Sequence, residues 1–101
     1  MPERNKFSVY WSEQSLNNAI RIESYLRENF TVKEIIRFHI KLQTFEEAVS
    51  NYPKLYPEAN VHSSLRRAVL SKQLSVYYKI TDDRIEVVAI LDNRCDISKW
   101  I

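Results

Sequence analysis

The residue types best suited to chemistry form a basic and aromatic set in the last third of the chain. Its members are Arg66, Arg67, Lys72, Tyr77, Tyr78, Lys79 and Arg94. On the face of a sheet, arginine and lysine can position phosphates while tyrosine rings stack on bases. The same cations can stabilise the charge that develops during metal-independent cleavage of a phosphodiester. A solvated basic face and a docking surface for an acidic protein segment are the open alternatives.

The other reactive residue types show no catalytic or metal-binding spacing. His39 and His62 have no carboxylate or cysteine at the spacing that a metal site needs. Cys95 is the only cysteine, so the chain can form no internal disulfide, which fits a reducing compartment. Asp82 and Asp83 adjoin each other where a turn is predicted. The absence of glycine excludes the glycine-rich loops that bind nucleotides, and we expect neither a metal nor a cofactor.

Length and composition indicate a single globular domain over residues 1–101. Of these residues 45% are hydrophobic and 28% are charged, which excludes an intrinsically disordered class. The net charge of +2 comes from residues 64–101, because residues 1–63 are neutral, and it is compatible with an anionic partner. The chain has no apolar run long enough to span a membrane, and its first residues lack the apolar core of a secretory signal. These features predict a cytoplasmic protein without membrane association.

Two amphipathic helices are predicted in the first half of the chain. Residues 6–11 have the composition of a strand, after which Ser12 is expected to cap a helix that runs to Asn29. Thr31 and Glu34 have the spacing of a capping box, and the helix that they begin would run to Asn51. Apolar residues recur at three- and four-residue steps in both helices. The predicted faces are Leu16, Ala19, Ile20, Ile22 and Leu26, and then Ile35, Phe38, Leu42, Phe45 and Val49, flanked by Val32, Ile36 and Ile40.

Three short strands are predicted after a proline-containing loop over residues 52–63. They cover residues 65–70, 74–80 and 85–91 and are joined by short polar turns. The middle strand alternates, with one face made of Leu74, Val76, Tyr78 and Ile80. The last strand, IEVVAIL, is apolar on both faces, which is typical of a strand that is covered twice. We expect its second face to present Val88 and Ile90 to the apolar tail or to a partner.

The predicted architecture is an α+β domain with two layers, in the order β-α-α-β-β-β. A helical hairpin packs on one face of a mostly antiparallel four-stranded sheet.

This order of elements resembles the RelE/ParE superfamily, the toxins of bacterial type II toxin–antitoxin (plasmid stabilisation) modules. The resemblance runs from about Phe7 to Trp100. It is carried by VYWSEQSLNNAIRIESYL near the start, by the Arg66-Arg67 pair, and by YYKITDDRIEVVAILDNR before a short polar tail. The combination of these segments, rather than any one of them, is specific for the superfamily.

The resemblance implies one of two activities. RelE-like members are ribosome-dependent nucleases that cut messenger RNA with basic residues on the sheet and a C-terminal tyrosine. ParE-like members have the same fold but poison DNA gyrase and are not enzymes themselves. Ser75 stands near the position of a RelE-like arginine and the tail has no tyrosine, so the resemblance favours the ParE-like branch.

Each branch assigns its own residues. A nuclease would use Arg66, Arg67, Lys72, Tyr77 and Arg94. A gyrase poison would contact its target through Arg66, Arg67, Lys72, Arg94 and Trp100.

The resemblance also implies a cognate antitoxin that wraps the toxin in a heteromeric assembly. Its predicted contacts are Val88, Ile90, Ile97 and Ile101. A third possibility is a non-toxic remnant that only binds the antitoxin.

Overall fold

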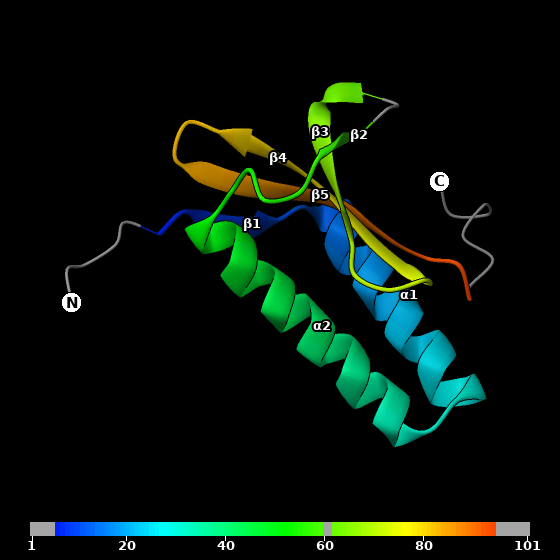
Figure 1. Cartoon of the computed structure of the whole chain (residues 1–101). Coiled ribbons are helices and arrows are strands. Elements are labelled where there is room, and N and C mark those ends of the chain that lie inside the picture. Colours follow the sequence, from blue (N-terminus) through cyan, green and yellow to red (C-terminus); the bar gives the residue numbers. More distant parts are fainter. Residues whose placement is uncertain (1–5, 60–61, 95–101) are drawn as a thin grey trace, which may run out of the picture.

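The structure, a computed structural model, describes residues 6–59 and 62–94, and it confirms the predicted α+β architecture (Figure 1). Strand β1 (Ser8–Trp11) leads into helices α1 (Glu13–Asn29) and α2 (Val32–Asn51), which form a hairpin. The strands that follow are β2 (Glu58–Ala59), β3 (His62–Val69), β4 (Leu74–Thr81) and β5 (Arg84–Asp92). Both helices lie on one side of the sheet, so the sheet has a helix-covered face and an open face.

The sheet has five strands in the order β1-β5-β4-β3-β2, so the prediction of four strands is wrong by one. The additional strand, β2, is only two residues long and lies at an edge, within the predicted loop. A segment this short has no alternation from which a strand could be predicted. Strand β1 pairs with β5 in parallel, and the other neighbours are antiparallel.

The core lies between the two helices and the covered face of the sheet. The predicted stripe of α2 is confirmed, since Phe38, Phe45 and Val49 are buried and Ile35 and Leu42 are partly buried, whereas the flanking apolar residues of this helix are exposed. The predicted face of α1 is wrong in part, because Leu16 and Ile20 are 50% and 60% exposed. The buried residues of that helix are Ser15, Asn18, Ile22 and Leu26. Polar side chains therefore make half of its packed face.

The two helices begin differently. Ser12 caps α1 as predicted, because its Oγ accepts a hydrogen bond of 3.0 Å from the Ser15 backbone N–H. The capping box predicted for α2 is wrong, since the Thr31 side chain makes no capping hydrogen bond. The Glu34 carboxylate instead lies 3.3 Å from Arg37 and 3.4 Å from Arg94.

A β-bulge in β5 breaks the alternation of this strand. Tyr77 pairs with Ala89 and Tyr78 pairs with Val87, so Val88 has no residue opposite it. One extra residue reverses the alternation of the strand, so Ile90 faces the helices, as Val87 does. The expectation that Ile90 lies on the second face is therefore wrong: it is 1% exposed and belongs to the core. Val88 is half-buried.

Helix α1 bonds to the backbone on both sides of this bulge. The Ser12 backbone N–H donates to the Val87 carbonyl at 3.0 Å, and the Ser12 hydroxyl donates to the Val88 carbonyl at 3.0 Å. The Ile90 backbone N–H donates to Asn18 Oδ1 at 3.1 Å. The buried Asn18 thus satisfies a backbone N–H beside the bulge, whereas the buried Ser15 donates its hydroxyl proton to the Ser12 carbonyl at 2.8 Å.

Replacing Asn18 with alanine is expected to lower the free energy of unfolding by about 1–3 kcal/mol, because the buried Ile90 N–H would lose its acceptor. Urea unfolding measures this loss. The control is Asn17→Ala, an exposed neighbour on the same helix, for which a change of only about 0.5 kcal/mol is expected. Equal losses for the two variants would contradict a structural role for the Asn18 amide.

Candidate functional site

Arg66 and Arg67, adjacent in the sequence, lie on opposite faces of the sheet. Arg66 pairs with Tyr78 on the covered face, where its Nη1 donates to the Tyr56 carbonyl at 2.7 Å. Its Nη2 also lies 4.0 Å from Glu58. Arg67 pairs with Tyr77 on the open face and is exposed, with its guanidinium 6.0 Å from the centre of the Tyr77 ring. The two arginines therefore cannot bind one ligand together.

Tyr78 is a core residue rather than a surface group. Its ring packs at 5.6 Å from Phe45 and 6.4 Å from Tyr56, measured between ring centres. Its hydroxyl donates to the Pro53 carbonyl at 2.7 Å. Burial raises the pKa of Tyr78 above its ordinary value, and the positive charge of Arg66 offsets part of that rise.

The free energy of unfolding is expected to fall as the pH rises above about 10, the ordinary tyrosine pKa. The unfolded chain loses the Tyr78 proton there, whereas the folded chain holds it to higher pH, so the unfolded state gains stability as the pH rises. Urea unfolding at several alkaline pH values measures this slope. Tyr78→Phe should reduce the slope, while the exposed Tyr10→Phe should keep it. The same slope in Tyr78→Phe and in the parent chain would contradict this assignment.

A basic and aromatic strip crosses the open face from β3 to β1. Arg67 and Tyr77 lie at one end, and Lys79 follows on β4. Arg84 on β5 lies 4.4 Å from the centre of the exposed Tyr10 ring. The sequence analysis does not identify Arg84 and Tyr10 as part of this surface. They lie together because β1 pairs in parallel with β5, and alternation of residue types does not reveal that pairing.

Glu86 lies within this strip and reduces its charge. Its carboxylate is 3.7 Å from the Lys79 ammonium and 3.8 Å from the Arg84 guanidinium. Arg67, by contrast, makes no ion pair within residues 6–59 and 62–94. Cations beside exposed aromatic rings can contact phosphates or the acidic surface of a protein. The strip is therefore a candidate binding surface, and its uncompensated charge lies at Arg67.

Arg94 lies away from the strip, just past the end of β5. Its Nε is 3.2 Å from Asp92 Oδ1, its Nη2 is 2.9 Å from Asp92 Oδ2, and its Nη1 is 3.4 Å from Glu34 Oε1. The hydrogen bond with Asp92 is the main cause that raises the pKa of Arg94 above its ordinary value. Arg94 therefore links the end of the sheet to the first turn of α2. Lys72 is exposed in the β3–β4 turn.

The structure thus separates the predicted basic and aromatic set into three places. Arg66 and Tyr78 lie on the covered face, Arg67, Tyr77 and Lys79 lie on the open face, and Arg94 and Lys72 lie at the far end of β5 and in the nearby turn. Trp100, Ile97 and Ile101 are outside the described residues, as is Cys95.

Among residues 6–59 and 62–94, no group of three or more metal-ligating side chains occurs, and His39 lies at the surface, 3.3 Å from Glu23. None of the helices there has the length and apolar character that crossing a membrane requires.

The fold of this chain is similar to the folds of solved structures from toxin–antitoxin systems, in agreement with the fold that the sequence resemblance predicts. A chain in the structure of the chromosomal ParDE toxin–antitoxin system from P. aeruginosa matches with a TM-score of 0.74 and 9% identity, over 88% of this chain and 98% of that chain. The YoeB dimer from Staphylococcus aureus matches with a TM-score of 0.57 and 12% identity, over 85% and 95%. The E. coli DinJ-YafQ toxin–antitoxin complex matches with a TM-score of 0.58 and 12% identity, over 88% and 94%. No protein-family model and no curated protein matches the sequence.

Proposed function

We propose that the protein is the toxin component of a type II toxin–antitoxin module and that, as a ParE-like toxin, it acts on DNA gyrase without being an enzyme itself. The observation that carries the choice of branch is the separation of the basic residues that a nuclease would need together. Cleavage of a phosphodiester requires cations that converge on one phosphate. Arg66 is bonded on the covered face, and Arg94 is held by Asp92 and Glu34.

Two further features support this branch. Ser75 stands near the position where the resemblance places a RelE-like arginine. Its side chain carries no charge that could stabilise the phosphorane formed during cleavage. The fold is also more similar to the ParDE chain, with a TM-score of 0.74, than to YoeB or YafQ, with 0.57 and 0.58. In this proposal the basic strip around Arg67 contacts the target, together with Lys72.

A cognate antitoxin would neutralise the toxin by covering apolar residues that the helical hairpin leaves exposed. Each helix carries such residues at four-residue spacing, which places them on one side of the helix. They are Leu16 and Ile20 on α1, and Val32, Ile36 and Ile40 on α2. An antitoxin segment with an apolar face fits this surface. The half-buried Val88 stays a proposed contact, whereas Ile90 is already covered by the helices.

The test is to induce this chain in bacteria without an antitoxin and to follow DNA and protein synthesis with labelled precursors during the first minutes. An early fall in DNA synthesis, with translation intact, is the expected result. An early fall in translation would overturn the gyrase assignment. No effect on either would overturn the toxin assignment, provided that the chain accumulates in folded form. A copy with an early stop codon controls for the burden of induction.

A RelE-like messenger RNA endonuclease is the second candidate, because Arg67, Tyr77 and Lys79 do share the open face. In that case Tyr77→Phe should abolish cleavage of ribosome-bound messenger RNA, while Tyr10→Phe, which removes a phenol hydroxyl from the far end of the same strip, should not. If neither variant changes cleavage, Tyr77 has no part in it.

A further inference from the structure

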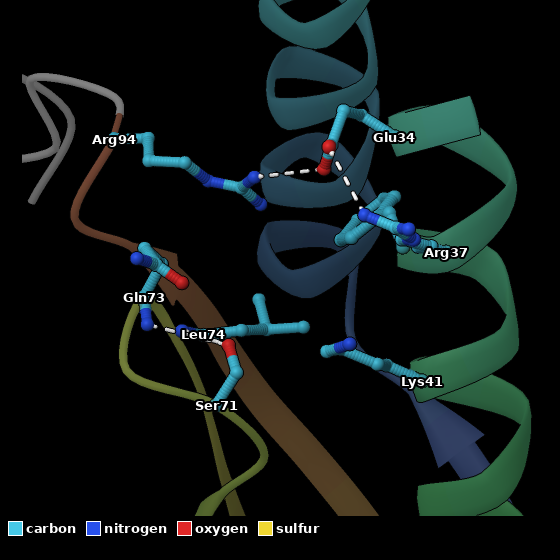
Figure 2. A pocket seen from close by; sticks show the side chains of 8 residues that line it. Glu34, Arg37, Lys41, Ser71, Gln73, Leu74 and Arg94 are labelled. Atoms are coloured by element: carbon cyan, nitrogen blue, oxygen red, sulfur yellow. Dashed lines mark hydrogen bonds and ion pairs between the residues drawn. The ribbon is translucent and has the colours of Figure 1, made fainter. Parts of the chain in front are cut away.

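A small pocket lies between the first half of α2 and the β3–β4 turn, apart from the basic strip on the open face (Figure 2). Its volume is about 170 Å³. Arg37 and Lys41 line it from α2, Ser71 and Gln73 line it from the turn, and Arg94 lines it from the end of β5. Pockets that hold whole small molecules are larger, with typical volumes of about 300–1,000 Å³. This pocket therefore fits one ionic group rather than a complete nucleotide.

The charges around the pocket leave one cation without a partner. The Glu34 carboxylate lies between Arg37, at 3.3 Å, and Arg94, at 3.4 Å, and Arg94 is also bonded to Asp92. With Lys41, the pocket thus has three cations but only the two carboxylates of Glu34 and Asp92 to compensate them. Lys41 makes no hydrogen bond or ion pair with any residue in the described ranges, although its side chain is partly buried. Figure 2 shows Lys41 extending from α2 toward the turn.

The turn adds neutral donors on the opposite wall. Ser71 Oγ accepts hydrogen bonds from the backbone N–H groups of Gln73, at 3.3 Å, and Leu74, at 3.2 Å (Figure 2). These two bonds fix the hydroxyl oxygen and leave its proton available to a ligand. The Gln73 side-chain amide makes no hydrogen bond within the described part of the chain. The pocket thus presents an ammonium and a guanidinium from α2, and a hydroxyl and an amide from the turn on the opposite wall.

We propose that this pocket binds a phosphate group, with Lys41 as its principal cation and Arg37, Ser71 and Gln73 as further donors. Phosphate has more acceptor oxygens than a carboxylate, so it can use donors that converge from several directions. The Glu34 carboxylate bonds to one nitrogen of Arg37, at 3.3 Å, so the other N–H groups of that guanidinium stay available beside Lys41 and the turn. The site goes beyond the proposed toxin function, because neither gyrase nor an antitoxin is needed for it. Free phosphate and the backbone of a nucleic acid are the two sources of such a group.

The test uses the purified full chain and NMR titration of the backbone amides of residues 71–74 at constant ionic strength. The probes are inorganic phosphate, dimethyl phosphate as a model of the nucleic-acid backbone, and acetate, with sodium chloride making up the ionic strength. Saturable shifts with inorganic phosphate are expected. Lys41→Gln should raise the dissociation constant by about tenfold or more, because the free energy of a hydrogen bond to a charged group corresponds to at least that factor. Lys54→Gln, in the segment that follows α2, is the matched control and should leave the dissociation constant unchanged.

Each outcome decides the proposal. Equal affinity for dimethyl phosphate supports the site and identifies a nucleic-acid strand as the source, whereas binding of inorganic phosphate alone supports the site and identifies the free ion or a monoester. Shifts that do not saturate, shifts that Lys41→Gln leaves intact, or acetate binding as tight as phosphate binding would each overturn it. Because the titration contains neither gyrase nor an antitoxin, its result is independent of the growth experiment.

Discussion

Replacing Arg94 with alanine is expected to lower the free energy of unfolding by about 3 kcal/mol, because it leaves a buried carboxylate without its cation. The Asp92 side chain is 0% exposed, and the Arg94 guanidinium bonds both of its oxygens. Breaking a buried ion pair by removing one partner costs about 3–5 kcal/mol. The lower end applies here because the Arg94 side chain is 24% exposed and water screens it in part. Urea unfolding measures the change.

Two variants identify the buried carboxylate as the cause. Arg84→Ala removes an arginine whose carboxylate partner is partly exposed, and a loss of about 1 kcal/mol or less is expected. Adding Asp92→Asn to Arg94→Ala should restore part of the lost stability, because the uncompensated charge disappears. A double variant as unstable as Arg94→Ala alone would contradict this explanation. A loss of toxicity in Arg94→Ala must therefore be interpreted together with its stability.

Replacing Phe45 with alanine is expected to lower the free energy of unfolding by about 3–5 kcal/mol, the usual range for a fully buried phenylalanine. Its ring lies 6.2 Å from Trp11, 6.1 Å from Tyr56 and 5.6 Å from Tyr78, between ring centres. These partners come from β1, the segment before β2, and β4, so the cavity would weaken contacts of α2 with three separate segments. Thermal and urea unfolding measure the loss.

The control for Phe45→Ala is Ile36→Ala on the same helix. Ile36 is exposed, so its truncation should change the free energy of unfolding by only about 0.5 kcal/mol. A similar loss at both positions would contradict a dominant role of the aromatic core, because alanine is the better helix former at each of them and helix propensity cannot cause the loss. If Ile36→Ala leaves stability unchanged but weakens binding of the antitoxin, the proposed antitoxin surface gains support.

The sequence predicts α2 well and α1 only in part, for a physical reason. The buried positions of α2 are apolar, so their periodicity is visible in the residue types themselves. On α1 the residue types do not indicate burial, because the polar Ser15 and Asn18 are buried. The apolar Leu16 and Ile20 are exposed. Asn18 is buried because it bonds to the backbone next to a bulge in β5, a requirement that arises only in the folded chain.

The candidate site was predicted less well than the fold, because its residues depend on pairing between strands. Alternation in β4 places Tyr77 and Tyr78 on opposite faces, as the sequence predicts. The separation of Arg66 from Arg67 follows once β3 is paired with β4, but the sequence alone does not supply that register. Similarly, nothing in the sequence indicates that Glu34 bonds to Arg94 rather than to the start of its own helix.

Pairing of β1 with β5 has a consequence for the order in which the chain can fold during synthesis. The first strand lies beside the last, and the hydrogen bond between Ser12 and Val88 joins residues 76 positions apart. A contact of this separation carries a large loop-closure entropy, and strands paired across such distances form late. The ribosome must release β5 before β1 has its neighbour and before α1 has the backbone groups that it bonds. A chain interrupted before residue 84 would therefore have the helical hairpin without β5, the strand that completes the sheet. Protein quality control would treat such a product as unfolded.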